Sequence, residues 1–340
     1  MIDLVEPLLG GDRRALARLL TAVENEAAGI ESALAALYPH TGHAWVIGLT
    51  GSPGSGKSSL VTALAKQYRA QGETVGIIAV DPTSPFTGGA ILGDRIRMRD
   101  LSGDRGVFIR SMATRGSLGG LSRATRDAIR VLDAAGFDRV LVETVGAGQS
   151  EVDIVRAAYT TVVIEAPGMG DDVQAIKAGI LEIADVLVVN KADRPGADNT
   201  VRGLRAMLEM GHPASREQLV RHHGQLIAVE TPTRSGDERL WLPPVVRTVA
   251  IEDKGIEEVM QAIEAHRAFL NQDGRMTTLE RQHIEIELHN RLREALMMRL
   301  LRTLPVASVE SIVNQVQQRT LDPQGAVEQL LEIQATTVAK

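Results

Sequence analysis

The sequence predicts an α/β protein built on a doubly wound, mostly parallel sheet, with helical extensions at the N- and C-terminal ends. From residue 44, short runs rich in β-branched residues alternate with amphipathic helical segments. Continuous apolar strands separated by helices are typical of a parallel sheet covered on both faces. Because ligands of such sheets bind at the carboxyl ends of the strands, the residues that close each run are the first candidates for function.

Seven runs have the composition of buried strands, and helical periodicity flanks them on both sides. An apolar pattern at helical spacing begins at Leu16 and stops near Pro39, and the chain after Gly255 again has a helical pattern. The strand runs are AWVIGLT, TVGIIAV, GVFIRSM, RVLVETV, TTVVIEA, DVLVVN and VVRTVAI. We expect an N-terminal helical extension over 1–40, a sheet domain over 41–270 with an inserted surface element at 211–244, and a C-terminal helical dimerisation region over 271–340.

Composition excludes several classes of protein. The 340 residues carry a formal net charge of -6, which supplies no global cationic field for nucleic acid or an anionic membrane. The chain contains no cysteine, so disulfides, thiolate metal sites and cysteine nucleophiles are excluded. No uninterrupted apolar run approaches the length of roughly 18 residues that predicts a membrane span. We expect a cytoplasmic protein that binds neither nucleic acid nor membrane.

A glycine-rich loop follows the first strand run and leads into a helical segment. It matches the pattern G-x-x-x-x-G-K-[ST] in the strand-loop-helix setting that this motif requires. Backbone N–H groups of such a loop converge on phosphate oxygens, Lys57 reaches the β and γ phosphates, and Ser58 can ligate Mg²⁺. The loop is therefore predicted to hold a nucleoside triphosphate. Its predicted binding residues are Gly51, Ser52, Pro53, Gly54, Ser55, Gly56, Lys57, Ser58 and Ser59.

The tetrapeptide Asn190-Lys191-Ala192-Asp193 closes the sixth strand run and favours guanine as the base. The Asp193 carboxylate can accept the N1–H and the N2 amino hydrogens of guanine, whereas adenine would leave it unpaired. Sites that pair buried polar groups reject analogues without the partner by roughly 10⁴-fold or more, so the predicted cofactor is GTP or GDP. A further base contact is predicted at the end of the last strand, from Thr248, Val249 and Ala250.

Acidic residues at strand ends and in loops predict a magnesium site. Glu143 closes RVLVETV, where an acid can order Mg²⁺ water, and Gly146 follows at a position where an N–H can contact the γ-phosphate. Asp81 and Asp94 are two further candidates, and because Mg²⁺ uses one or two carboxylates, not all of the acids need to ligate it directly. Ala147 cannot orient a water, so we expect slow basal hydrolysis.

Longer motifs resemble the MeaB/ArgK group of P-loop GTPases over about residues 10 to 300. They are DPTSPFTGGAILGDRIRM, ETVGAGQSEVDI, APGMGDDVQAIKAGILEIADVLVVNKAD and RTVA. The resemblance implies a GTPase chaperone that gates adenosylcobalamin loading and protects an acyl-CoA mutase such as methylmalonyl-CoA mutase. It also implies phosphate and magnesium roles for Lys57, Ser58, Asp81, Asp94 and Glu143, and base recognition by Asn190, Lys191 and Asp193.

The same resemblance implies that the segment from Ala166 to Lys177 responds to the partner. Its glycines make it pliable, and Lys177 is the candidate within this chain for a basic group brought to the developing phosphate charge. An ordinary strand-to-helix connection is the alternative interpretation of this segment. If the first interpretation holds, mutase binding accelerates GTP hydrolysis.

Alternatives stay open at several points. Ile284, Leu288, Leu292, Leu296 and Leu300 recur four apart, and this stripe either packs on its own domain or joins two copies. The 211–244 element is either an inert surface excursion or a partner contact. Two other functions are considered, a nickel-inserting GTPase, which usually carries a cysteine motif that this chain lacks, and a GTP-binding module of amino-acid transport regulation.

Overall fold

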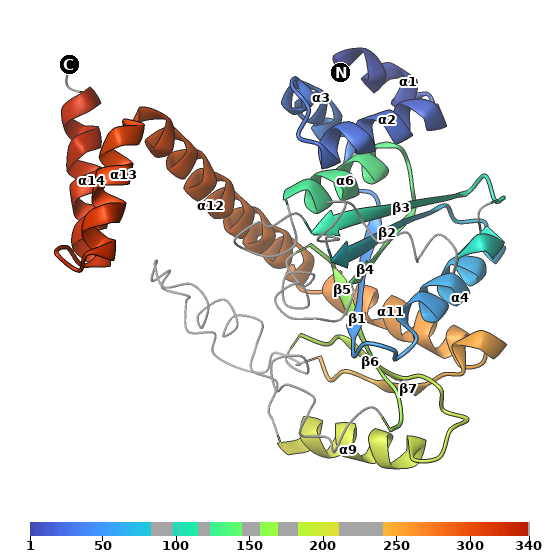
Figure 1. Ribbon diagram of the computed structural model, residues 1–340. Helices are drawn as coiled ribbons and strands as arrows, with labels where there is room; N and C mark the ends of the chain where they lie inside the picture. Colours follow the sequence, from blue (N-terminus) through green and yellow to red (C-terminus); the bar gives the residue numbers. More distant parts are fainter. Residues whose placement is uncertain are drawn as a thin grey trace. The chain divides into compact units, whose positions relative to one another are not determined.

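The seven apolar runs form the seven strands of one sheet in the computed structural model, which describes residues 1–82, 98–101, 103–114, 123–144, 157–168, 183–210 and 241–338 (Figure 1). The strands are β1 (Trp45–Gly51), β2 (Val75–Pro82), β3 (Val107–Thr114), β4 (Arg139–Thr144), β5 (Thr160–Glu165), β6 (Val186–Val189) and β7 (Val245–Arg247). They lie in the order β3-β2-β4-β1-β5-β6-β7, and every pair of neighbours is parallel. The predicted doubly wound sheet is confirmed.

The strand order places a topological switch at β1. After β1 the chain builds β2, β3 and β4 on one side of it, and then crosses to build β5, β6 and β7 on the other side. The register brings Leu49 beside Glu143 and Gly51 beside Ile164, so β1, β4 and β5 end close together. Open parallel sheets bind their ligands at the carboxyl edge beside such a switch, and the glycine-rich loop begins there.

Helices cover both faces of the sheet. Helix α4 (Lys57–Ala70) packs on β1, β2 and β4 and against α11 (Ile256–Leu270), which lies on β5 and β6. On the other face, alternate strand residues such as Val46 share a core cluster with α6 (Arg123–Ala134), and α9 (Ala197–Met210) contacts β6 and β7. Short 3-10 helices occur at Ile2–Leu4, Tyr38–His40, Arg99–Leu101 and Ala250–Glu252.

Three N-terminal helices extend the core beyond α6. They are α1 (Val5–Leu9), α2 (Arg13–Glu24) and α3 (Ile30–Leu37). Leu16, Leu19 and Leu20, spaced for one face of α2, are buried in the same cluster as the residues of α6. The α2 helix begins after Asp12, whose carboxylate accepts a hydrogen bond from the Arg14 N–H at 2.7 Å and so caps the helix.

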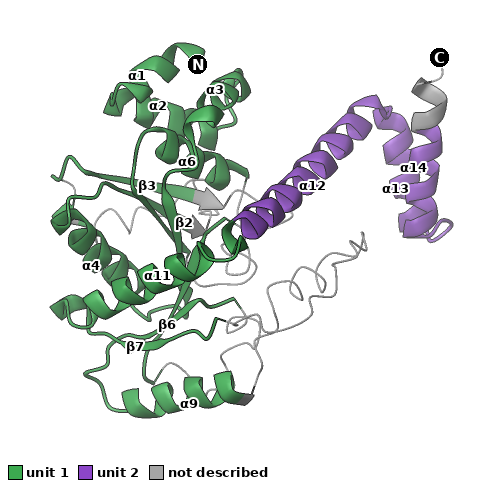
Figure 2. Ribbon diagram, turned by 180° about the vertical axis from the view of Figure 1, so that it is seen from behind, with its two compact units in different colours: residues 1–276 green, residues 277–340 purple. Residues whose placement is uncertain are grey.

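The chain divides into two compact units, Met1–Met276 and Thr277–Lys340 (Figure 2). The second unit contains most of α12 (Arg275–Thr303) together with α13 (Val306–Gln317) and α14 (Pro323–Val338), and the last two helices pack on each other. Apolar side chains remain exposed on α12. A search of the described residues finds no helix long and apolar enough to cross a membrane.

Candidate nucleotide-binding site

The glycine-rich loop connects β1 to α4 and is pressed against two other strand ends. Gly51 closes β1 with φ +137°, and a Cβ atom there would lie 2.0 Å from the carbonyl oxygen of Ile164. Gly56 precedes α4 with φ +94°, and a Cβ atom there would lie 2.3 Å from the side-chain nitrogen of Asn190. Only glycine fits both positions, because any side chain would meet strain and a clash. The loop is thus shaped by β5 and by the loop after β6.

The interior of this loop presents groups that fit a phosphate chain. Lys57 is buried, and its ammonium donates hydrogen bonds to the carbonyl oxygens of Gly51 at 2.9 Å and Ser52 at 3.0 Å. The Ser55 hydroxyl is also buried and has no hydrogen-bond partner among the described residues. A buried cation and an unsatisfied hydroxyl at the N-terminus of α4 match an anionic ligand, which would attract Lys57 and accept a hydrogen bond from Ser55.

Two side chains with oxygen atoms that can ligate a metal meet where α4 begins and β4 ends. Ser58, in the first turn of α4, donates a hydrogen bond from its hydroxyl to Glu143 at 2.6 Å, and Glu143 is buried. A hydroxyl and a carboxylate in contact are hard oxygen ligands of the kind that Mg²⁺ prefers. These residues fit the predicted ion, and the structure brings their side chains into contact.

Several predicted site residues fall where the structure gives no side chain or no position. Asp81 belongs to the end of β2, but its side chain is not described. Asp94, Gly146 and Lys177 lie outside the described residues. Most of the segment from Ala166 to Lys177 and of the 211–244 element also lies outside them. The roles of these residues stay predictions.

The predicted base-recognition residues are tied to the phosphate loop by hydrogen bonds. The Asn190 amide donates to the Ser55 carbonyl oxygen at 2.8 Å, and the Lys191 ammonium donates to the Gly54 carbonyl oxygen at 2.6 Å. Asn190 also accepts from the Thr248 hydroxyl and the Ala250 N–H, each at 3.1 Å. Asn190 is therefore the link between three loops that the sequence identified separately.

Asp193 lies exposed just beyond Asn190, with charged neighbours from the loop after β7. Val249 pairs with Lys254 in an isolated antiparallel bridge, which turns this loop back on itself. The Lys254 ammonium contacts Glu252 at 2.6 Å. The hydrogen bond to Glu252 holds the pKa of Lys254 above its usual value, and the Asp193 carboxylate adds a smaller effect in the same direction. Asp193 is thus an exposed carboxylate that lies near Lys254, two residues beyond the lysine that contacts the phosphate loop, and its role in recognising a base stays a prediction.

Glu165, which the sequence reasoning did not select, also belongs to this site. It closes β5, is buried, and accepts hydrogen bonds from the Ser52 hydroxyl at 2.8 and 3.0 Å. The sequence does contain a pattern that could have identified Glu165. Like Glu143, it is an acid at the end of a buried apolar strand.

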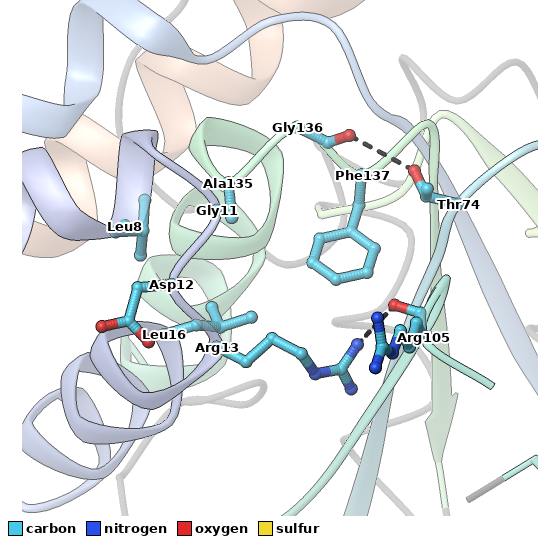
Figure 3. Close-up of a pocket in the computed structure, with 10 residues that line it drawn as sticks. All are labelled: Leu8, Gly11, Asp12, Arg13, Leu16, Thr74, Arg105, Ala135, Gly136 and Phe137. Atoms are coloured by element: carbon cyan, nitrogen blue, oxygen red, sulfur yellow. Dashed lines mark hydrogen bonds between the residues drawn. The ribbon is translucent and has the colours of Figure 1, made fainter. Parts of the chain in front are cut away.

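A separate cavity of about 160 Å³ lies at the opposite edge of the sheet (Figure 3). Thr74 and Arg105 precede β2 and β3, Phe137 precedes β4, and Arg13 and Leu16 come from α2. These strand residues lie at the amino ends of their strands, whereas the phosphate loop leaves the carboxyl end of β1. The cavity is therefore not part of the candidate nucleotide site.

The all-parallel doubly wound sheet and the strand-loop-helix geometry of residues 51–58 place the protein among the P-loop nucleotide-binding proteins. The model of the family described as methylmalonyl Co-A mutase-associated GTPase MeaB matches residues 16–304. The chain belongs to this family, as the sequence motifs indicated.

Three individual proteins illustrate the relationship. A predicted GTPase of Pyrococcus abyssi is 48% identical over 333 residues, which cover 98% of this chain and 96% of that protein. GTPase ArgK of Escherichia coli is 35% identical over 286 residues, covering 83% of this chain and 80% of that protein. The crystal structure of an LAO/AO transport system kinase superposes with a TM-score of 0.66 at 27% identity, covering 97% of this chain and 96% of that one.

Proposed function

We propose that this protein binds guanine nucleotides with Mg²⁺ and hydrolyses GTP, and that it acts as a chaperone of an adenosylcobalamin-dependent acyl-CoA mutase. The observation that carries the nucleotide part is the hydrogen bond from Asn190 to the Ser55 carbonyl oxygen at 2.8 Å. It joins the loop predicted to recognise guanine to the loop predicted to hold the phosphates. The relatives in this family are themselves named GTPases.

In the proposed mechanism, the chain supplies charge and geometry for phosphoryl transfer to water. Lys57 exchanges its two carbonyl contacts for phosphate oxygens and stabilises charge that develops on them. Ser58 and Glu143 would hold the magnesium ion, which would supply positive charge at the phosphates. Asp193 accepts the N1–H and N2 hydrogens of guanine. We assign slow turnover to the protein alone, because Ala147 offers no polar group to orient the attacking water.

The mutase is proposed as the partner on the strength of the family description, which names a methylmalonyl Co-A mutase-associated GTPase. A missing charge supplied on complex formation is worth roughly 10³ to 10⁵ in hydrolysis rate in GTPases. A partner that completes the site would therefore act as an activator, and the nucleotide state would in turn gate loading of the cobalamin cofactor onto the mutase. We place the protein in the cytoplasm, where such a mutase would meet it.

We further propose that the second unit joins two copies of the chain. Ile284, Leu288, Leu292 and Leu296 on α12 are all more than half exposed, Leu288 at 66%. Two residues of this stripe, Leu292 and Leu296, line a mostly apolar groove of about 500 Å³ together with Leu331 of α14. A twofold axis would place the same surface of a second copy against this one, which would remove apolar area from water on both sides.

The test compares GTP turnover of the wild type alone with turnover in the presence of methylmalonyl-CoA mutase. Phosphate release is the assay, and Lys57→Ala is the variant expected to lose both activities. The matched control is Lys66→Ala, which changes an exposed lysine of the same helix that pairs with Asp100. Wild-type protein that binds ATP as tightly as GTP would refute the nucleotide assignment. The partner assignment would be refuted if the mutase leaves GTP turnover unchanged and this protein leaves cobalamin loading of the mutase unchanged.

A further inference from the structure

Glu165 places a buried carboxylate directly against the phosphate loop. The side chain is 5% exposed, and both of its oxygens lie within hydrogen-bond distance of the Ser52 hydroxyl. Ser52 is the first residue after β1, so its hydroxyl fixes the direction in which the loop leaves the strand. The backbone oxygen of Glu165 also accepts a hydrogen bond from the Asn190 N–H at 2.8 Å.

The hydrogen bond to Ser52 does not require a negative charge. A glutamine side chain has nearly the same shape, and its amide oxygen would accept the hydroxyl hydrogen equally well. The negative charge of Glu165 therefore has its own effect on nucleotide binding, apart from the hydrogen bond that its oxygens accept. A buried anion close to a loop that holds phosphates repels them, and this repulsion is stronger in a protein interior than in water.

We propose that Glu165 is a positioning residue that sets nucleotide affinity through two opposed effects. Its oxygens hold Ser52 and thereby the first turn of the phosphate loop, which favours binding. Its charge opposes the phosphates, which weakens binding and speeds release of the nucleotide. The inference rests on the proposed function, because it assumes that this loop holds a nucleotide.

The two effects predict opposite outcomes for two substitutions at one position. Glu165→Gln keeps the acceptor and removes the charge, so it should bind GDP and GTP more tightly than the wild type. The gain should be larger for GTP, which carries more negative charge. Glu165→Ala removes the acceptor as well and leaves the loop unsupported. A lost hydrogen bond to a charged group corresponds to about a tenfold loss of affinity, and that loss should exceed the gain from removing the charge.

Ser52→Ala tests the same hydrogen bond from its other end. It should weaken GDP binding by about as much as Glu165→Ala or more, since the charge remains in this variant. The double variant should be no weaker than Ser52→Ala alone, because one interaction cannot be lost twice. Dissociation constants of GDP and GTP would be measured by titration calorimetry in the presence of Mg²⁺, with thermal unfolding as the check that each variant folds.

Asp185 provides a matched control. It is 5% exposed, precedes the neighbouring strand β6, and accepts a hydrogen bond from the Thr161 N–H at 2.7 Å, but it lies at the amino edge of the sheet. Asp185→Asn should leave both dissociation constants unchanged. Glu165→Gln that binds GTP no better than the wild type, or binds as poorly as Glu165→Ala, would overturn the inference. Wild-type protein that binds no guanine nucleotide would instead refute the proposed function.

Discussion

Replacement of Asn190 by alanine should destabilise the first unit even without nucleotide. Asn190 is 2% exposed, and its side chain makes three hydrogen bonds, one donated to the Ser55 carbonyl oxygen and two accepted from Thr248 and Ala250. Alanine removes all three and leaves the two donors and the carbonyl oxygen to find other partners. The substitution therefore removes the hydrogen bonds by which the Asn190 side chain joins the phosphate loop, the loop after β6 and the loop after β7.

The magnitude follows from the number and burial of these contacts. A typical intramolecular hydrogen bond contributes about 1 kcal/mol net, so three of them correspond to about 3 kcal/mol of unfolding free energy. A buried donor that stays unsatisfied would increase this loss, whereas water entering the vacated space would reduce it. GDP affinity should fall as well, because Ser55 and the residues proposed to recognise the base are no longer held together by Asn190.

Tryptophan fluorescence during urea unfolding is the suitable assay. The chain has two tryptophans, Trp45 and Trp241, and both belong to the first unit, so the signal does not mix the two units. Asn199→Ala is the matched control, because Asn199 is exposed at the start of α9 and should shift the unfolding free energy by less than about 0.5 kcal/mol. An Asn190→Ala protein that unfolds like this control and binds GDP like the wild type would refute the reasoning.

Three further predictions concern the base, the ion and assembly. Asp193→Asn should weaken binding of GDP and strengthen binding of xanthosine diphosphate, whose 2-oxo group accepts a hydrogen bond from an amide. Competition binding measures this preference, and an unchanged preference would show that another residue recognises the base. Glu143→Gln should bind GTP but release phosphate slowly, and full activity of this variant would mean that the ion is held elsewhere. EDTA should stop hydrolysis by the wild type, and full activity in EDTA would mean that no ion is required. Changing both Leu288 and Leu292 to glutamate should give monomers in sedimentation velocity, and a monomeric wild type would contradict the proposal. The control is Ile251→Glu, at an apolar position of the first unit that is 81% exposed, which should leave the dimer intact.

The local sequence was sufficient for the strands and the phosphate loop because their signals are local. Continuous apolar runs identify buried strands without knowledge of their neighbours, and the spacing from Gly51 to Ser58 defines a loop whose backbone must approach an anion. The pair Ser58 and Glu143 could also be anticipated, since both follow from the rule that parallel strands end at one edge. In the structure the two side chains are in direct contact at 2.6 Å, while their role at a magnesium ion stays a prediction.

Tertiary structure alone decided which of these residues contact one another. The sequence does not state that β5 lies beside β1, and this adjacency places Glu165 against Ser52. Likewise, Asn190 reaches Ser55 only because β6 follows β5 in the sheet and Gly56 leaves room for its side chain. Strand order depends on long-range pairing, which for β1 and β5 joins segments more than 100 residues apart, and no local pattern of apolar residues specifies it. The sequence therefore determined the elements and their chemistry, while the packing of the sheet determined the contacts that join them into a site.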